Sequence, residues 1–377
     1  MRFLHTGDLH LDSAFCAYGE RGAQNLREGG RELLRSIFEC AKNEKCEMIL
    51  FSGDVFDSKT VTPESAELFC SLVEECNIPV IVSPGNHDNY SQSSFYAKAV
   101  KRLGEKLTLF TSSELQYFDF DELRVRVFGY AFTAPVLSKA PLLEAEVPED
   151  NGYLRILCAH ADMASPISRY APLTLGELAR WNFAYTALGH IHNRAEKEDE
   201  AGRVRYCGFA EGRGFDELGR GGVWIVDADE DICECRRVVL SKSAFYVADV
   251  ELGYTDDFES AKDKIANAIA DQNHKAGASV RIVLSGSADS AVIDEIYRNS
   301  DKIKDDAEID YLEFIDETLP TFDGEYLERD TTLRGEFYRT LLPKLSSDNA
   351  QERRIAIKAL QIGLAAIDGK SVLKIRD

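Results

Sequence analysis

The chain has 377 residues, of which 44% are hydrophobic and 29% are charged, and its formal net charge is −21 at pH 7. This length predicts two or three domains with sizeable cores, and the composition excludes a globally disordered chain. The strong net acidity argues against broad, non-specific adhesion to nucleic acid or to an anionic membrane. It does not exclude a nuclease, because bound metal ions and a local basic patch can supply positive charge.

Neither a secretion signal nor a membrane span is expected. The first polar motif begins at Asp8, too early for a signal peptide, and no apolar run approaches the roughly 18 residues of a membrane helix. The nine cysteines are odd in number and scattered, as expected for reduced thiols in a cytoplasm. The nearest pair, Cys233 and Cys235, lacks the two-residue gap of zinc hooks, so we expect all nine cysteines to be structural.

The first hundred residues alternate strand-like and helix-like stretches. Pro63 precedes one helix at the first helical position, which tolerates its missing N–H. The alternation is typical of a layered α/β fold. We expect strands at 2–6, 46–52 and 78–83, and helices at 24–43, 64–75 and 93–103.

From residue 107 onwards, short strands dominate the pattern. We expect Trp181 and Trp224 to be core residues. A domain boundary is predicted near Ser241–Ser243, so that residues 1–242 form the first domain. The expected strands are 107–111, 115–120, 124–130, 153–159, 183–188, 204–207, 222–226 and 232–240, with a loop at 135–151 and a helix near 173–181.

Beyond the boundary the chain returns to alternating strands and helices. Thr255 is the expected N-cap of the first helix. Residues 301–330 carry twelve acidic and three basic side chains, whereas residues 331–377 carry nine basic and five acidic ones, a polarity that suggests an interaction tail. We expect a small α/β domain at 243–320 and a helical segment at 321–377, with strands at 244–252, 280–284 and 309–314 and helices at 255–273, 288–300, 333–342 and 357–367.

Five short polar stretches each follow an apolar, strand-like run, and they hold five of the seven histidines. In an open α/β fold, ligands and metals gather at the carboxyl ends of strands, so five such ends can converge on one place. We therefore expect a single metal site. The stretches are Asp8-Leu9-His10, Gly53-Asp54, Gly85-Asn86-His87-Asp88, His160 within Cys158–Asp162, and Gly189-His190-Ile191-His192.

Two divalent cations need a bridging anion, neutral imidazoles and further oxygen ligands, and these stretches contain all three. Asp54 is the natural bridge because it stands in a tight turn at the end of a strand. Mixed nitrogen and oxygen ligation without thiolate suits manganese, iron or zinc. The candidate ligands are Asp8, His10, Asp54, Asn86, His160, His190 and His192.

His87 is left over from this ligand set. With Asp88 beside it, His87 is placed to protonate a leaving oxygen, so we take both as candidate catalytic residues. A proton donor beside a metal pair is typical of phosphate ester hydrolysis. Each stretch alone is weak evidence, but their order and their positions at strand ends together indicate a binuclear hydrolase.

The ordered motifs Asp-X-His, Gly-Asp, Gly-Asn-His-Asp, His and Gly-His-X-His resemble those of the calcineurin-like metallophosphoesterases. The resemblance implies an α/β (α+β) fold, a two-sheet sandwich with helices outside, in agreement with the strand count. It also implies that His87 is the catalytic histidine. It places Asp8, His10, Asp54 and His192 on one metal, and Asp54, Asn86, His160 and His190 on the other.

Flanking stretches narrow the resemblance within that superfamily. Leu4–Leu11 and Gly53–Asp57 resemble the SbcD-type DNA repair exonucleases, while His10–Phe15 and Gly212–Glu217 are similar to their YhaO-like branch. The resemblance implies a subunit that hydrolyses DNA phosphodiester bonds as an exonuclease or endonuclease, with manganese as the first choice of metal.

The same resemblance implies roles for the rest of the chain. Residues 243–320 would form a capping domain over DNA, and residues 321–377 would contact a coiled-coil ABC-type ATPase of the SbcC type. Two positions depart from the group. Asp57 stands where archaeal and eukaryotic relatives carry a further histidine, and Arg220-Gly221 replaces the more usual Lys-Gly.

Other interpretations stay open. A phosphodiesterase or phosphatase acting on nucleotides or phosphoproteins is the alternative enzyme, favoured by the net acidity. A non-enzymatic scaffold would require lost ligand positions, and none is lost. Arg27, Arg31 and Arg35 could together touch a phosphate backbone, although their alternation with glutamates favours a salt-bridged helix face. Homodimer formation is left open.

Overall fold

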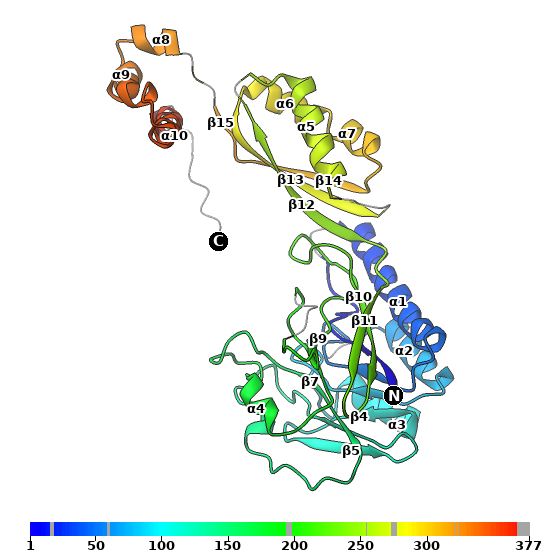
Figure 1. Cartoon of the computed structure of the whole chain (residues 1–377). Coiled ribbons are helices and arrows are strands. Elements are labelled where there is room, and N and C mark those ends of the chain that lie inside the picture. Colours follow the sequence, from blue (N-terminus) through cyan, green and yellow to red (C-terminus); the bar gives the residue numbers. More distant parts are fainter. Residues whose placement is uncertain are drawn as a thin grey trace. The chain divides into compact units, whose positions relative to one another are not determined.

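The computed structural model describes residues 1–15, 19–58, 61–193, 198–253, 255–272, 277–320, 322 and 324–367. The chain divides into two compact units, Met1–Ala244 and Phe245–Asp377 (Figure 1). The roles predicted for residues 243–320 and 321–377 stay predictions. Within the described residues, every helix is too short or too polar to cross a lipid bilayer.

A six-stranded sheet forms one layer of the first unit. β1 lies between β2, which runs parallel to it, and β10, which runs antiparallel. The parallel pairing continues through β3 to β4. In spatial order the strands are β11 (Cys233–Val239), β10 (Gly222–Ala228), β1 (Arg2–Thr6), β2 (Ile49–Phe51), β3 (Val80–Val82) and β4 (Leu107–Leu109).

A five-stranded sheet forms the second layer. β5 is antiparallel to β6, and the remaining neighbours are parallel. The central strands are almost wholly apolar because both faces of this sheet are covered. In spatial order the strands are β5 (Gln116–Phe120), β6 (Val125–Gly129), β7 (Leu154–His160), β8 (Tyr185–Gly189) and β9 (Val204–Tyr206).

Three apolar clusters hold the two layers and their helices together. One, which includes Phe3, Leu50 and Ile156, fills the space between the sheets. The others pack helices on the outer faces, and Trp181 and Trp224 are buried as predicted. The two-sheet sandwich flanked by helices is therefore confirmed. Its helices are α1 (Gly19–Asn43), α2 (Pro63–Glu75), α3 (Phe95–Leu103) and α4 (Leu175–Ala179), with 3-10 turns η2 (Gly104–Lys106) and η3 (Pro141–Leu143).

Helix α1 is longer than predicted and begins at Gly19. Its arginines bind within the protein. Arg31 and Arg35 pair with Glu28, at 2.7 Å and 3.7 Å, and Arg27 donates to the carbonyl of Ser13. This geometry favours the salt-bridged helix face over a phosphate-binding one.

Over the described residues, the second unit begins with a four-stranded sheet and three helices. One prediction is wrong here, and one helix was missed. Asp257, not Thr255, caps α5, because its side chain accepts the Ser260 N–H. The helix expected at 288–300 is present as α6, and a second short helix, α7, which was not predicted, follows it after Asn299. The elements are β12 (Ala244–Leu252), α5 (Phe258–Ala270), β13 (Ala278–Ala288), α6 (Ser290–Arg298), α7 (Ser300–Asp306), β14 (Tyr311–Asp316) and β15 (Leu319–Pro320).

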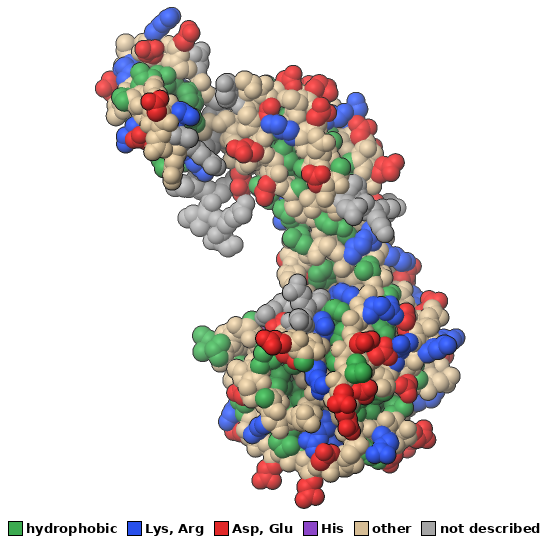
Figure 2. All heavy atoms as spheres, viewed as in Figure 1, with side chains coloured by type: hydrophobic (Ala, Val, Ile, Leu, Met, Phe, Trp, Pro, Cys, Tyr) green, Lys and Arg blue, Asp and Glu red, His purple; other side chains and the backbone are tan. Residues whose placement is uncertain are grey.

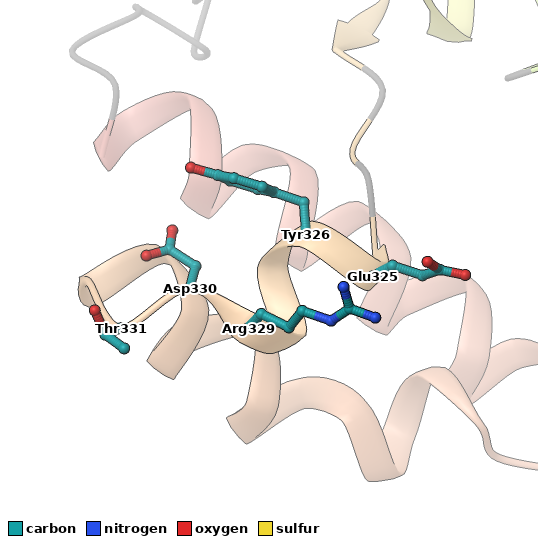
Figure 3. A pocket seen from close by; sticks show the side chains of 5 residues that line it. All are labelled: Glu325, Tyr326, Arg329, Asp330 and Thr331. Atoms are coloured by element: carbon teal, nitrogen blue, oxygen red, sulfur yellow. The ribbon is translucent and has the colours of Figure 1, made fainter.

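Three further helices follow: α8 (Gly324–Arg329), which was not predicted, α9 (Leu333–Leu345) and α10 (Ala350–Ile367). Their apolar faces pack on one another through Leu327, Tyr338 and Leu360. A surface cavity of about 440 Å³ is lined by Glu325, Tyr326, Arg329, Asp330 and Thr331 (Figure 3).

Candidate metal centre

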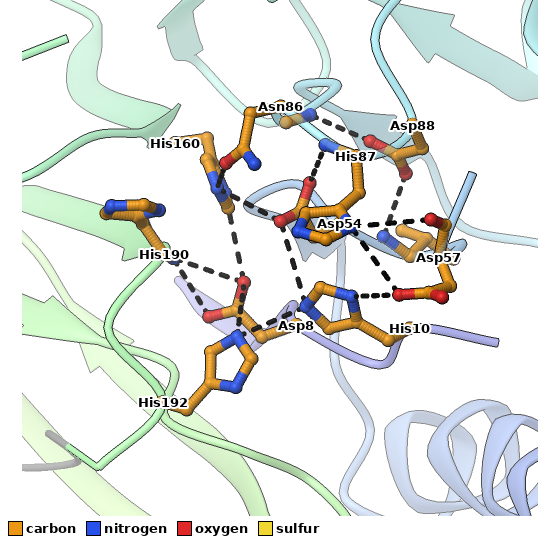
Figure 4. Close-up of polar contacts among 12 residues, drawn as sticks. Asp8, His10, Asp54, Asp57, Asn86, His87, Asp88, His160, His190 and His192 are labelled. Carbon is orange, nitrogen blue, oxygen red and sulfur yellow. Dashed lines mark hydrogen bonds and ion pairs between the residues drawn. The ribbon is translucent and has the colours of Figure 1, made fainter. Parts of the chain in front are cut away.

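The five predicted motifs meet at the carboxyl ends of strands from both sheets (Figure 4). Asp8 follows β1, Asp54 follows β2, and Asn86 follows β3. Across the sandwich, His160 ends β7 and lies in register with Gly189, the last residue of β8. Because neighbouring parallel strands end side by side, loops far apart in the sequence deliver their polar side chains to one place.

Backbone bonds fix these loops against one another. The N–H of Asp8 donates to Gly53 at 3.0 Å, and the N–H of His10 donates to Asp54 at 3.0 Å. Four non-glycine residues of the centre have positive φ angles: Asp8 at 50°, His10 at 43°, Asp54 at 49° and His190 at 106°. Such angles are uncommon outside glycine and cluster at functional sites, where they turn side chains in a direction that a regular strand cannot.

Two glycines allow the close approach of the loops. A Cβ atom on Gly85 would lie 2.2 Å from Oδ1 of Asp54. A Cβ atom on Gly189 would lie 2.2 Å from the carbonyl oxygen of Ser52 and 3.0 Å from Nδ1 of His160. Any other residue at either position would displace a candidate ligand, so these glycines are required by packing.

Among the described residues there are three groups of side chains whose ligand atoms lie within 4.8 Å of one another inside each group. The groups share Asp8, His10 and Asp54, so they form one continuous centre. Asp8, His10 and Asp54 each belong to two groups. Oδ2 of Asp54 faces Nε2 of His160 at 3.3 Å and Nε2 of His10 at 3.7 Å, as expected of a bridging ligand. The groups are Asp8, His10 and His192; His10, Asp54 and His87; and Asp8, Asp54 and His160.

The ring nitrogens of His10 and His192 are arranged as ligands of a cation. Nδ1 of His10 lies 3.0 Å from the Asp57 carboxylate, and Nδ1 of His192 lies 2.7 Å from Glu217. In the tautomer that carries its proton on Nδ1, each imidazole donates a hydrogen bond to its carboxylate, and the lone pair of Nε2 is free. These two Nε2 atoms face each other at 3.1 Å. Two lone pairs that close repel each other unless a proton or a metal ion neutralises them.

His160 presents the same situation on the other side of the centre. Its Nδ1 lies 3.0 Å from the carbonyl oxygen of Ser52, and its Nε2 faces Oδ1 of Asn86 at 3.0 Å and Oδ2 of Asp54 at 3.3 Å. With Nδ1 donating to Ser52, the lone pair of Nε2 meets two oxygen acceptors, from Asn86 and Asp54. The side chains of His160, Asn86 and Asp54 therefore fit a second cation.

His190 is placed differently from the other candidate ligands. Its backbone N–H donates to both carboxylate oxygens of Asp8, at 2.9 and 3.1 Å. Its ring lies against Tyr170, with 4.7 Å between the centroids, and its Nε2 is 3.9 Å from Asp162. Among the described residues, none of the three convergent groups includes His190. Metal ligation by His190 stays a prediction.

His87 lies at the edge of the centre, with 46% of its side chain exposed. The backbone N–H of His87 donates to Oδ1 of Asp54 at 2.9 Å. Its Nδ1 lies 3.3 Å from the carbonyl oxygen and 3.5 Å from the carboxylate of Asp57. The hydrogen bond to Asp57 raises the pKa of His87, in spite of partial burial. Asp57 thus favours the protonated form of this partly exposed imidazole.

Asp88 was predicted to act with His87, but the contacts of its carboxylate in the structure are with other residues. Its carboxylate is buried and accepts the N–H of Val55 and that of Gly85, both at 2.8 Å, and the hydroxyl of Tyr96 at 2.6 Å. Burial and the nearby charge of Asp54 raise the pKa of Asp88 to about 6. Asp88 ties two motif loops together, and the carboxylate that contacts His87 is Asp57.

The charges of the centre are mutually dependent. Burial disfavours a charged His160, but the adjacent carboxylates of Asp54 and Asp8 raise its pKa to about 9. Burial opposes ionisation of Asp54 as well, and the imidazoles of His160 and His10 nevertheless hold its pKa below the usual range. A buried carboxylate pair of this kind needs positive charge, which protons or metal ions can supply.

Sequence reasoning missed the supporting roles of three residues. Asp57 was noted only as a departure from relatives, and Glu217 only as part of a resembling stretch. Glu217 is buried and also binds Arg213. The thiol of Cys207 lies 3.2 Å from Oδ2 of Asp8. One feature of the sequence indicated the role of Asp57, which is its position three residues after Asp54, at the end of the same turn.

Residues 1–194, just over half of the chain, match the sequence model of a family described as calcineurin-like phosphoesterase. The chain belongs to this family. The calcineurin-like phosphoesterases are metal-dependent hydrolases with a binuclear metal centre, and the aspartate and histidine cluster described above can bind metal ions.

Two relatives extend the comparison. The chain is 26% identical over 309 residues to the uncharacterised metallophosphoesterase YhaO of Bacillus subtilis, covering 76% of this chain and 72% of YhaO. It is 23% identical over 245 residues to the DNA double-strand break repair protein Mre11 of Saccharolobus solfataricus, covering 62% of this chain and 61% of Mre11. A solved structure of a dimetal phosphatase from Danio rerio aligns with a TM-score of 0.40 at 13% identity, covering 64% of this chain and 96% of that one.

Proposed function

We propose that this calcineurin-like phosphoesterase is a nuclease of the SbcD type, which hydrolyses phosphodiester bonds in DNA during repair. The observation that carries the proposal is a buried cluster of aspartates and histidines that can hold two metal ions, with the half-exposed His87 at its edge. The similarity to Mre11, a DNA double-strand break repair protein, supports DNA as the substrate.

The residues divide between holding metal and moving a proton. Asp8, His10, Asp54 and His192 would hold one cation, and Asp54, Asn86, His160 and His190 the other. When bound, such a cation pair polarises the phosphoryl group and activates the nucleophile. Asp57 engages Nδ1 of His87 and favours its protonated form, so Nε2 of His87 can hand a proton to the leaving oxygen. Manganese is our first choice among manganese, iron and zinc.

The proposed partners are DNA and an SbcC-like coiled-coil ATPase. On the face in Figure 2, acidic and basic side chains are interspersed, so we expect DNA contact to depend on the metal centre rather than on a broad basic surface. Apolar side chains are exposed on the C-terminal helices, among them Tyr326 at 62%, Leu333 at 68% and Ile355 at 62%. We propose this region for the ATPase contact. Free thiols at all eight described cysteines suit a cytoplasmic location.

The direct test is manganese-dependent cleavage of linear double-stranded and single-stranded DNA. We expect His87→Ala to bind manganese normally and to cleave about 100- to 10,000-fold more slowly, the usual contribution of a general acid. If the wild-type protein leaves DNA intact while it consumes small phosphodiesters, the nuclease proposal is wrong.

A second candidate, a phosphodiesterase or phosphatase acting on nucleotides or phosphoproteins, is favoured by the net charge of −21. Repulsion would disfavour a long polyanion more than a small substrate. A panel of cyclic nucleotides, dinucleotides and phosphopeptides, assayed beside DNA at equal manganese concentration, separates the two candidates.

A further inference from the structure

Cys233 and Cys235 form a dithiol outside the ligand set of the metal centre. They occupy alternate positions on β11, so both side chains point to the same face of this edge strand. Their sulfur atoms lie 3.8 Å apart, and both side chains are half-buried against the core between the sheets. The pair thus combines solvent access with a fixed geometry.

Three donors surround a single acceptor beside this dithiol. The carbonyl oxygen of Gly202 lies 3.7 Å from Sγ of Cys233, 3.8 Å from Sγ of Cys235, and 3.2 Å from Nε of Arg205. A carbonyl oxygen offers two lone pairs. The third hydrogen must therefore turn elsewhere, and the neighbouring sulfur is within reach. In the thiol form, all three donors are satisfied only when one S–H turns to the other sulfur, 3.8 Å away.

Arg205 supplies positive charge at the dithiol. Its guanidinium lies over the ring of Trp224, 4.6 Å from the centroid. Gly202, with a φ of 71°, has no side chain and so leaves room for the guanidinium. A Cβ atom on Gly202 would lie 3.1 Å from Nη2 of Arg205. The hydrogen bond from Cys233, together with Arg205, lowers the pKa of Cys235 to about 7, while the pKa of Cys233 is raised. One proton of the pair is therefore readily lost.

We propose that Cys233 and Cys235 bind one soft monovalent metal ion, of the Cu(I) type, as a two-coordinate bis-thiolate. Thiolates select such ions, whereas a structural zinc site needs four ligands. Among the described residues, no group of three or more convergent ligand atoms includes either cysteine. Two thiolates and one monovalent cation carry a net charge of −1, which Arg205 neutralises. Both thiol protons pass to solvent, and no oxidation state changes.

The test is an anaerobic Cu(I) titration of the full chain, preloaded with manganese, in competition with bicinchoninate. We expect one tightly bound Cu(I) per chain. Cys233→Ser and Cys235→Ser should each weaken binding by at least about 100-fold, and Arg205→Gln by about 10- to 100-fold, the range for residues that support a metal ligand. Cys76→Ser is the matched control, because Cys76 is also half-buried but lies on another element, at the C-cap of α2, and this variant should bind Cu(I) like wild type.

X-ray absorption of the copper complex gives a readout independent of affinity. Two sulfur neighbours are expected, with none in the double serine variant. Nitrogen neighbours, or a double variant that binds as tightly as wild type, would overturn the proposal. Phosphoesterase activity of the double variant should stay at the wild-type level, so the outcome is separate from that of the proposed nuclease.

Discussion

Oδ1 of Asp57 lies 3.5 Å from Nδ1 of His87, and the same oxygen lies 3.0 Å from Nδ1 of His10. One carboxylate therefore orients a predicted metal ligand and the predicted proton donor together. A substitution at Asp57 should affect both metal binding and proton transfer, although Asp57 belongs to neither set.

Asp57→Asn tests this link. Asparagine keeps the size of the side chain but removes the charge that raises the pKa of His87. We expect kcat to fall about 10- to 100-fold. Because a lower pKa means that the histidine loses its proton earlier, the alkaline limb of the pH profile of kcat should move to lower pH. An unchanged alkaline limb would show that Asp57 does not set the pKa of the proton donor.

Asp54→Asn should cause the greatest loss among the ligand substitutions. Oδ2 of Asp54 faces both His160 and His10, at 3.3 Å and 3.7 Å, so its charge would act on both cations. We expect the bound metal to fall below one ion per chain, measured by elemental analysis after gel filtration. Asp119→Asn is the control. Asp119 lies on β5 and pairs with Arg126 on β6, so this variant should keep its full content of bound metal. Near wild-type turnover in Asp54→Asn would show that the bridge is misassigned.

Metal binding should release protons. The pKa of His160 is about 9 without metal, so this imidazole is protonated at pH 7.5 and must lose its proton to become a ligand. The apparent affinity for manganese should therefore rise with pH between 7 and 9. Calorimetric titrations in two buffers of different ionisation enthalpy would count the protons. Equal heats in both buffers would contradict the assignment.

Gly85→Ala should abolish tight metal binding, because its Cβ would lie 2.2 Å from Oδ1 of Asp54. Gly29→Ala is the matched control. Gly29 lies within α1 with no atom within 4 Å of the added Cβ, and alanine there should stabilise the fold by about 0.5–1 kcal/mol. Thermal unfolding with and without manganese distinguishes a lost site from a lost fold. A Gly85→Ala protein that manganese stabilises as strongly as it stabilises wild type would exclude this role of Gly85.

Most of the centre could be predicted because its ligands obey a local rule: each follows a buried strand. The contacts of Asp88 could not, because its carboxylate reaches Val55, 33 residues earlier, across two loops that dock only in the folded protein. Local patterns also missed α7, which follows α6 after Asn299 alone, without proline or glycine between the two helices. The sandwich itself was implied by the family resemblance of the ordered motifs, and the strand count agreed with it.

The position of β1 has a consequence for how the protein forms. Arg2 pairs with Asp227 in β10, so the second residue of the chain finds a partner more than two hundred positions later. Closing such a large loop precedes any gain from the contacts it allows, which slows folding. During synthesis, the N-terminal strand would wait for β10 to leave the ribosome, with one of its edges open to mispairing until then.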